Sequence, residues 1–369
     1  MANVYTKMGS YPEQDVTFLL KDLSSIEIEK STEERERSIQ SGAHYSEMLP
    51  IEYKPTIAYM DLFYQSLEES KQKVAEAVAI VAEQIVKKRG FQTVLCSLAR
   101  AGTPIGVLIK RYIRFKYGIE LPHYSISIIR DRGIDENALK YILSQHPEFE
   151  IAFIDGWTGK GAISNELRRA VVQFEKTHGI QLSDELAVLA DPGFCTDVYG
   201  TREDFLIPSA CLNSTVSGLV SRTVLNNRWI HADDFHGAKY YDELLAEDVS
   251  NMYVDTIEAE FASIQANARQ QAETLLAENS TADWRGMASI EAIGKEFQID
   301  NTHLIKPGVG ETTRVLLRRI PWKILIKPGS REALKHILLL AEDRGVPVIE
   351  YDKMSYTCCG LIRPLEKSI

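Results

Sequence analysis

Long apolar segments are missing from this sequence of 369 residues. It contains no run of about 18 uncharged apolar residues and so offers no candidate transmembrane helix. The N-terminal residues, MANVYTKMGSYPEQDVTF, also lack the basic and then apolar order of an export signal. Cysteine is scarce, with five residues and no C-x-x-C pair, which argues against a disulfide framework and a zinc knuckle. We therefore expect a cytoplasmic protein with reduced thiols and no membrane partner.

Positive charge is in deficit, because 42 Lys and Arg are outnumbered by 52 Asp and Glu, for a net charge of -10. This balance argues against a protein that coats nucleic acid. The deficit is uneven: residues 301–369 hold 12 Lys and Arg and 7 Asp and Glu, a balance of +5, which leaves -15 for residues 1–300. A basic module on an acidic body is compatible with nucleic-acid contact.

Apolar strand patterns alternate with helix patterns in the middle of the chain. The helix patterns cover 66–90, 106–118, 136–145 and 164–179, and strand patterns begin at 91, 123, 150 and 185. This alternation predicts a parallel sheet with helices on both faces. The length and the 44% apolar content predict more than one domain. We expect an N-terminal extension over 1–60 that packs on the body, a body over 61–265, a helical connection over 266–300 and a C-terminal domain over 301–369.

Three turns follow three of these strands: SLARAGTP at 97–104, RDRGID at 130–135 and DGWTGKGA at 155–162. Because the carboxyl ends of parallel strands meet at one edge of a sheet, we expect the three turns to lie together. The third turn is rich in glycine and precedes a helix, so its converging N–H groups suit a phosphate. A turn that only joins strand to helix is the alternative, and the P-loop pattern G-x-x-x-x-G-K-[ST] is not satisfied.

These turns resemble those of the type I phosphoribosyltransferases. More closely, the segments GSYPEQDVTFLLKDL, IQSGAHYSEMLP and FIDGWTGKGAI resemble the StiP-like, phosphoribosyltransferase-like proteins of bacterial tellurite-resistance operons. The resemblance extends over essentially the whole chain. It implies an α/β fold with a type I phosphoribosyltransferase-like parallel sheet flanked by helices, plus a small C-terminal α/β/α domain. Some members of that group carry the label cysteine protease.

The resemblance implies roles for residues in the three turns. Asp155 is expected to face the ribose hydroxyls and Arg100 to bind the pyrophosphate, both as catalytic residues. The motif of the phosphoribosyltransferases has two adjacent acids, where this chain has Asp155 alone. The implied phosphate-binding residues are Thr158, Gly159, Lys160, Gly161, Ala162 and Ser164, the pyrophosphate loop is Ala99, Arg100, Ala101 and Gly102, and the flexible loop carries Arg130 and Arg132.

Phosphoribosyl pyrophosphate or a related ribose phosphate is therefore the expected substrate, with transfer of its ribosyl group to an unidentified acceptor. Mg²⁺ is expected as a substrate-bound cofactor, because this ion is held largely by phosphates and water rather than by a protein cage. On this basis we predict a glycosyltransferase that makes a nucleotide-like metabolite in a stress-resistance operon. A regulator that binds a ribose phosphate and RNA without chemistry is the alternative.

The acceptor is expected to bind residues 190–218 and the following segment HADDFHGAKYY, at 231–241. Asp191 ends a strand, where a binding or catalytic carboxylate is well placed. Asp234 and His236 are close enough in sequence to share a proton-transfer or metal-binding role. The alternative is a solvated loop that happens to carry acids and a histidine.

The C-terminal residues resemble the pelota family of kink-turn RNA binders. In that family a helix start reading G-x-N-E-x-T-K grips RNA, and residues 308–314 correspond to it here with Gly310 in place of asparagine. The resemblance implies RNA contacts from Gly310, Glu311, Thr313 and Arg314, to which Arg318 and Arg319 add charge. A small domain that packs on the body or forms a homodimer is the alternative.

A cysteine protease is a further alternative, with Cys358 as nucleophile and His336 as base. The adjacent Cys359 would point to the opposite side of an extended chain, and cysteine is often simply a small buried residue. No local protease signature is present in the sequence. We therefore predict that replacing either of the two adjacent cysteines abolishes no proteolysis.

Overall fold

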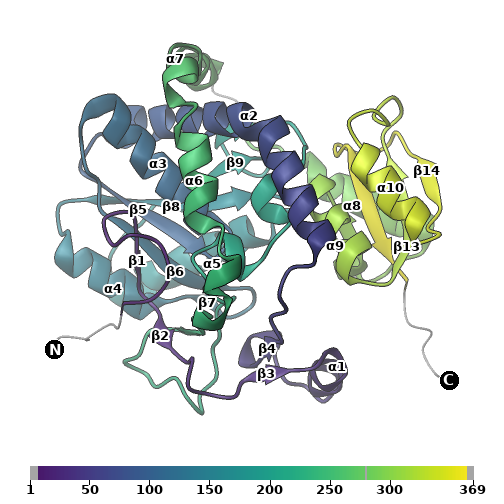
Figure 1. The fold of residues 1–369 in the computed structure, drawn as a ribbon. Helices are drawn as coiled ribbons and strands as arrows, with labels where there is room; N and C mark the ends of the chain where they lie inside the picture. The colour runs from purple at the N-terminus through teal and green to yellow at the C-terminus, as the bar shows by residue number, and fades with distance from the viewer. Residues whose placement is uncertain (1–6, 279–280, 364–369) are drawn as a thin grey trace.

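The computed structural model describes residues 7–278 and 281–363, apart from the side chains at positions 32, 36, 40 and 318. Figure 1 shows a large body built on a central sheet, with a smaller unit beside it that contains α8, α9 and α10. None of the helices in these two described ranges is long and apolar enough to cross a membrane.

The body is built on a seven-stranded sheet in the order β1–β6–β5–β8–β9–β10, with β7 paired to β6. All neighbours along this path are parallel, whereas β7 forms an antiparallel hairpin with β6. Its strands are β1 (Thr17–Phe18), β5 (Thr93–Ala99), β6 (His123–Ile129), β7 (Gly133–Ile134), β8 (Glu150–Trp157), β9 (Leu186–Ala190) and β10 (Val198–Thr201).

Helices cover both faces of this sheet, because each central strand is apolar on both of its sides. On β8, Ala152 and Ile154 belong to the apolar cluster of α2 and α3, whereas Ile151 and Phe153 belong to that of α4 and α5. The predicted parallel sheet with helices on both faces is therefore confirmed. The helices are α2 (Ile57–Arg89), α3 (Gly102–Tyr117), α6 (Ser250–Glu258) and α7 (Phe261–Glu278) on one side, and α4 (Glu136–Gln145) and α5 (Ala162–His178) on the other.

Helix ends follow the signals in the sequence. Gly90, with a φ of 69°, ends α2 where the sequence predicted a stop, although the helix begins earlier than residue 66. Asp135 begins α4, because its side chain accepts a hydrogen bond from the Ala138 N–H at 3.0 Å. These local signals explain why the helix boundaries inside the body are close to those predicted.

The N-terminal residues form two small parallel sheets, one of which includes a strand of the body. One pairs β2 (Lys21–Asp22) with β11 (Gly237–Ala238), and the other pairs β3 (Glu29–Lys30) with β4 (Leu49–Pro50). Between β3 and β4 lies α1 (Thr32–Gln40), a short helix rich in charged residues. The chain also forms the short 3-10 helices η1 (Tyr45–Glu47), η2 (Pro208–Ala210), η3 (Ser214–Val216), η4 (Asp242–Glu247) and η5 (Thr302–Leu304).

The C-terminal unit has a four-stranded sheet in the order β12–β15–β13–β14. β15 is antiparallel to both of its neighbours, and β13 and β14 are parallel. Ile290 and Ile293 of α8 join the core beneath this sheet, so we propose that the unit starts before α8 rather than at residue 301. Its elements are α8 (Arg285–Phe297), β12 (Ile305–Pro307), α9 (Val309–Arg318), β13 (Pro321–Ile326), α10 (Lys335–Asp343), β14 (Val348–Glu350) and β15 (Cys358–Ile362).

Asp204 joins the two units. Its carboxylate accepts hydrogen bonds from the N–H of Val309, the first residue of α9, and from the N–H of Thr357, each at 2.8 Å. An acidic side chain at a helix start also interacts favourably with the helix dipole. The body therefore caps a helix of the C-terminal unit.

Candidate functional site

The three turns predicted to meet do so, because they follow β5, β6 and β8, which are neighbours in the sheet. The first turn touches the third at Gly102, where a Cβ would collide with the Ile154 carbonyl oxygen and lie 3.1 Å from the Asp155 Cα. Only glycine allows α3 to begin so close to β8. The Ala99–Arg100 peptide in the first turn is cis, and Ala101 precedes the helix.

The third turn surrounds the start of α5, as expected. Gly161 precedes this helix with a φ of 76°, and Ala162 is its first residue. Ser164 lies just inside the helix, and its hydroxyl oxygen is buried without a hydrogen-bond partner among the described residues. The first N–H groups of a helix have no partner inside the helix, so the turn offers donors to an anion or an oxyanion. Phosphate binding there stays a prediction.

Two side chains tie the third turn to its surroundings. The Thr158 hydroxyl donates to the Asp191 carboxylate, and the Lys160 ammonium donates to the Thr302 carbonyl at 2.7 Å. Burial, followed by the positive charge of Lys306, lowers the pKa of Lys160 to about 8. This lysine can therefore lose its proton near neutral pH.

Asp155, the predicted catalytic residue of this turn, lies near the end of β8. Its carboxylate accepts the Gly156 N–H at 2.7 Å, and burial raises its pKa to about 7. Arg100 lines a large cavity described below, and Asp155 does not line it.

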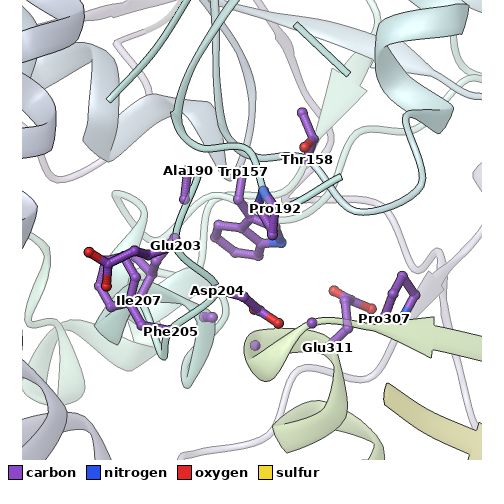
Figure 2. A pocket seen from close by; sticks show the side chains of 13 residues that line it. Trp157, Thr158, Ala190, Pro192, Glu203, Asp204, Phe205, Ile207, Pro307 and Glu311 are labelled. Carbon is purple, nitrogen blue, oxygen red and sulfur yellow. The ribbon is translucent and has the colours of Figure 1, made fainter. Parts of the chain in front are cut away.

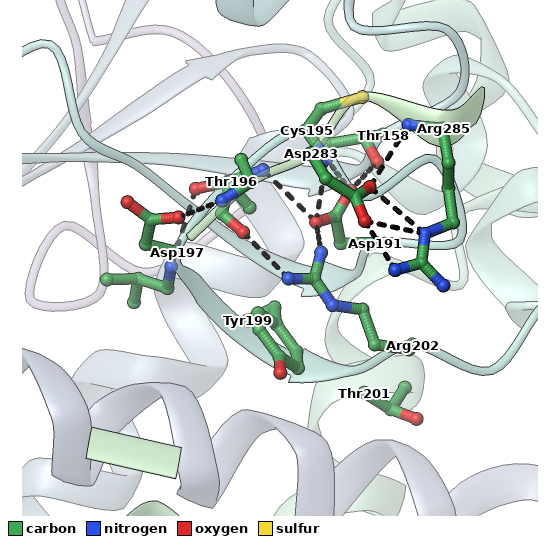
Figure 3. A network of polar contacts seen from close by, with 12 residues as sticks. Thr158, Asp191, Cys195, Thr196, Asp197, Tyr199, Thr201, Arg202, Asp283 and Arg285 are labelled. Carbon is green, nitrogen blue, oxygen red and sulfur yellow. Dashed lines mark hydrogen bonds and ion pairs between the residues drawn. The ribbon is translucent and has the colours of Figure 1, made fainter. Parts of the chain in front are cut away.

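Asp191 organises the loop that follows β9, as Figure 3 shows. Its fully buried carboxylate pairs with Arg202 and accepts hydrogen bonds from the N–H of Cys195, at 2.9 and 3.0 Å, and of Thr196, at 3.1 Å. With Thr158 as a further donor, every direction around this carboxylate is occupied. Asp191 therefore holds the loop and the glycine turn in place rather than facing an acceptor.

Cys195 lies against the glycine turn. Its sulfur is 3.8 Å from the Gly159 carbonyl oxygen, and a Cβ at Gly161 or at Gly193 would lie only 3.0 Å from the same sulfur. The thiol therefore contacts the residue that begins α5. A helix N-terminus favours a thiolate, but burial dominates here and raises the pKa of Cys195 to about 11. In this conformation the residue is a protonated thiol.

The C-terminal unit covers this thiol. The Trp284 ring occupies the space beside Gly161, and the Gly286 N–H donates to the Gly193 carbonyl at 3.1 Å. The Tyr356 hydroxyl donates to the Gly159 carbonyl at 3.0 Å. Residues from two separate segments of the C-terminal unit thus enclose the turn that Cys195 contacts.

A small cavity of about 20 Å³ lies between the glycine turn and α9. Figure 2 shows Trp157 and Thr158 of the body on one side of it and Pro307 and Glu311 of the C-terminal unit on the other. The volume is about that of one water molecule. The space is therefore a packing gap between the units and too small for a substrate.

The predicted flexible loop is anchored at several points. The Asp131 and Gly133 N–H groups donate to the buried Glu166 carboxylate of α5, at 2.8 and 3.1 Å. The guanidinium of Arg130 bonds His303 at 2.9 Å, and that of Arg132 bonds Glu47 at 3.0 Å. Both arginines are thus engaged with neighbouring segments in this conformation.

Of the three predicted acceptor residues, Asp234 and His236 line one cavity and Asp191 does not. The Asp234 carboxylate pairs with Lys21 at 2.6 Å, and the His236 ring bonds the Ser127 hydroxyl at 2.8 Å. Both line an open cavity of about 660 Å³ that Asp191 does not line. Burial lowers the pKa of His236, so this ring is neutral near pH 7.

A second large cavity, of about 650 Å³, lies between the body and the C-terminal unit, and Lys and Arg far outnumber the acids in its lining. Sequence reasoning singled out few of its residues, because they come from widely separated segments. Eight Lys or Arg and two Glu line it, a formal balance of +6; they are Lys30, Arg35, Lys54, Arg100, Arg222, Lys306, Arg314, Arg319, Glu52 and Glu311.

The predicted RNA-binding residues at the start of α9 face the body. Arg314 donates to the Ala210 carbonyl at 2.9 Å and to Glu311 at 3.1 Å, and Gly310 packs against the Ala210 side chain. The buried Thr313 hydroxyl donates to the Val309 carbonyl at 2.8 Å. The exposed Arg319 lines the cation-lined cavity, whereas the Arg318 side chain lies outside the described residues. The expected RNA grip is therefore mostly inside the protein.

Cys358 and His336 do not form the predicted pair. Cys358 is fully buried in β15, where burial raises its pKa, and Cys359 is buried beside it. The His336 ring contacts the Thr313 hydroxyl at 3.4 Å, and burial lowers its pKa to about 4. The other histidine-ring hydrogen bonds of the described chain likewise reach groups other than a thiol.

Comparison with known proteins shows the family of this chain. Residues 9–258 match the model of the tellurite-like stress resistance cysteine protease StiP. The chain belongs to the StiP family. A cysteine protease StiP from Acinetobacter baylyi is 35% identical over 373 residues, which cover 97% of this chain and 95% of the relative. Residues 284–364 match the PELOTA RNA binding domain.

These findings correct the functional prediction. The family and the relative carry the name cysteine protease, so the predicted phosphoribosyltransferase, its glycosyltransferase activity and its place in nucleotide synthesis are wrong. The resemblance to StiP proteins and to the pelota domain is confirmed. The prediction from the glycine turn was wrong because a turn that offers N–H groups can bind an oxyanion as well as a phosphate.

Proposed function

We propose that the protein is a cysteine-dependent hydrolase that cleaves peptide bonds, with Cys195 as its nucleophile. The name of the Acinetobacter relative supports the reaction class. The contact between the Cys195 sulfur and the glycine turn at the start of α5 is the observation that carries the choice of residue. Among the five cysteines, this one lies in a loop at the carboxyl edge of the sheet.

The other four cysteines are less suited to attack a substrate. Cys96 lies inside β5, and Cys358 and Cys359 lie inside β15, all fully buried in apolar clusters. Cys211 is fully buried beside the Ser66 hydroxyl, 3.9 Å away. Burial in apolar surroundings keeps a thiol protonated and unreactive.

The start of α5 supplies what the reaction needs beside the sulfur. A thiolate bonds to the carbonyl carbon of the substrate, and the carbonyl electrons move to oxygen, where the N–H groups of the turn stabilise the negative charge. The C–N bond then breaks, the amine leaves with a proton, and water hydrolyses the thioester. Lys160, with a pKa of about 8, is our candidate to take the thiol proton.

The covered thiol means that this conformation is a resting state in the proposal. Trp284 and Tyr356 must move for a peptide to reach the sulfur, because they enclose the turn. Exposure would also lower the pKa of Cys195, since burial is what raises it. Opening of the C-terminal unit would therefore uncover and activate the thiol together.

Alkylation and cleavage measured on the same variants test this proposal. Wild-type protein should cleave unfolded casein, and Cys195→Ala should abolish cleavage while Cys358→Ala and Cys359→Ala retain it. Mass spectrometry after limited iodoacetamide treatment should find Cys195 modified before Cys96 or Cys211. Unchanged cleavage by Cys195→Ala, with its fold verified by circular dichroism, would overturn the assignment.

We further propose that the body has the type I phosphoribosyltransferase fold and uses it as a scaffold for thiol chemistry. The parallel order β1–β6–β5–β8–β9–β10 and the hairpin that follows β6 support this. A crystal structure superimposed on enzymes of that fold tests it, and a different strand order would overturn it.

RNA contact by the C-terminal unit is our second proposed function, supported by the pelota match over residues 284–364. Because the start of α9 faces the body, we assign the contact to exposed cations after β13, namely Lys327, Arg331 and Lys335. Affinity for a structured RNA should fall as salt rises. A Lys327→Glu and Arg331→Glu double variant that binds RNA as well as the wild type would contradict this assignment.

A further inference from the structure

The cation-lined cavity lies where three distant parts of the chain approach each other. Residues of the β3–β4 region and the N-terminal end of α2 form one wall, residues 212–222 form a second, and Lys306 and α9 form the third. Figure 1 shows α9 beside the N-terminal end of α2, with β3 and β4 below them. Its volume of about 650 Å³ falls in the range of about 300–1,000 Å³ typical of small-molecule sites.

Arg222 carries charge that the described residues do not neutralise. Its guanidinium donates to two neutral acceptors, the carbonyls of Tyr45 at 2.7 Å and of Met48 at 2.9 Å, and its buried Nε has no hydrogen-bond partner in the described chain. Burial, with the positive charges of Arg35 and Arg100, lowers the pKa of Arg222 to about 10. An anion placed here would relieve this repulsion.

The facing wall is also rich in positive charge. Burial and the nearby charges of Arg319, Arg130 and Arg314 lower the pKa of Lys306, which Glu311 only partly opposes. Glu311 itself is bonded by Arg314, so its carboxylate is already engaged. Cations from the C-terminal unit therefore face cations from the body across one cavity.

Two further polar residues of the lining are Thr215 and Glu52. The Thr215 hydroxyl is buried without a hydrogen-bond partner among the described residues, on a side chain that is 1% exposed. Glu52, the second carboxylate of the lining, accepts hydrogen bonds from the Ser214 N–H at 3.1 Å and the Ser214 hydroxyl at 2.9 Å. Glu52 is thus already engaged by two donors.

We propose that this cavity binds a small molecule bearing two or more phosphate groups. Guanidinium forks match the oxygens of a phosphate. The lining keeps an excess of cations over acids even after Lys54 pairs with Glu247 outside it, which calls for a ligand with several negative charges. The ligand bridges Arg100 and Arg222 of the body and Lys306 and Arg319 of the C-terminal unit. Its binding therefore holds the two units together.

This site is independent of the proposed cysteine chemistry. None of the residues that enclose Cys195, namely Gly159, Gly161, Gly193, Trp284 and Tyr356, lines the cavity. The test can therefore rely on binding alone, without any measurement of hydrolysis. Failure of one proposal leaves the other standing.

Isothermal titration of the full chain with inorganic tripolyphosphate, and separately with ATP, each with and without Mg²⁺, tests the proposal. We expect a Kd below about 100 µM for at least one of them and much weaker binding of orthophosphate. Stronger binding of ATP than of tripolyphosphate assigns the site to nucleotides, and the reverse assigns it to inorganic polyphosphate. Affinity should fall as salt rises.

Variants locate the site. Arg222→Met should weaken binding about tenfold or more, because it removes a charge-assisted donor. Arg319→Met serves as a second variant that leaves the fold intact, since this side chain is exposed at the cavity. Arg228→Met is the matched control, because Arg228 is exposed beside Trp229 and does not line the cavity.

Three results would overturn the proposal. These are no binding of either polyphosphate to the wild type, equal affinities of all three variants, and binding of RNA alone. In the last case, RNA binding that is lost in Arg222→Met would assign the cavity to a nucleic-acid strand instead.

Discussion

The indole of Trp284 fills the space into which a side chain at Gly161 would project. Trp284 itself has a φ of 56°, in the left-handed region that favours glycine. The absence of a side chain at Gly161, just before α5, thus makes room for the Trp284 ring. The Cys195 sulfur lies against the same glycine.

Replacing Trp284 with glycine should uncover the thiol without straining the backbone, because glycine readily adopts a positive φ. We expect Cys195 to react with iodoacetamide about tenfold faster in Trp284→Gly than in the wild type, as local opening becomes easier. The rate is measured by mass spectrometry of the peptide that contains Cys195. Trp322→Gly, which removes an indole that packs against Phe297 rather than against Gly161, is the control. Equal rates in all three proteins would show that Trp284 does not limit access.

Removing the charge of Asp191 should destabilise the body. Asp191→Asn leaves Arg202 without its carboxylate in a buried setting, which costs about 3–5 kcal/mol of unfolding free energy. Urea unfolding followed by circular dichroism measures the loss. The exposed pair of Asp283 and Arg285 is the matched control, and Asp283→Asn should change stability little. Equal effects of the two substitutions would contradict the buried ion pair.

Stability should depend on pH through Asp155. Burial raises its pKa from 3.8 to about 7, so the folded state binds more protons than the unfolded state between these values. The contribution of this group to the free energy of unfolding is therefore full below about pH 4 and decreases as pH rises to 7. Asp155→Asn should remove this decrease, so that the free energy of unfolding of the variant rises relative to that of the wild type between pH 4 and pH 8. A constant difference across that range, as expected for the exposed control Glu243→Gln, would argue against a raised pKa.

Two glycines at the same sheet edge should respond oppositely to alanine. Gly102→Ala forces a methyl group against the Ile154 carbonyl and should cost about 1–3 kcal/mol of stability. Gly159→Ala should be tolerated, because the nearest atom to its new Cβ is 3.8 Å away, on Pro307. Thermal unfolding of the two variants measures the contrast. Similar melting temperatures would mean that α3 can move away from β8.

Much of the body could be predicted because its signals are local. The strand beginning near residue 150 and the helix over 136–145 follow from apolar patterns, and Gly90 and Asp135 act on their own helix ends. The meeting of three turns then follows from the parallel order of the strands. These parts need no knowledge of long-range packing.

The docking of the two units could not be predicted in this way. Arg314 bonds the Ala210 carbonyl across 104 positions of sequence, and this contact holds the start of α9 against the body. Cys195 belonged to a segment assigned to an acceptor, but nothing in its local sequence indicates that a helix start and Trp284 lie against it. The cation-lined cavity likewise exists only once the units have docked.

Glu166 couples the β6–β7 hairpin to helix α5. The carboxylate of this buried residue of α5 accepts hydrogen bonds from the N–H groups of Asp131 and Gly133 at the tip of the β6–β7 hairpin. The hairpin and the helix are therefore expected to move together. The hairpin tip also carries Arg130 and Arg132, which reach the outer segments of the chain. A displacement of those arginines would therefore also shift α5, whose N-terminal turn lies against the Cys195 sulfur.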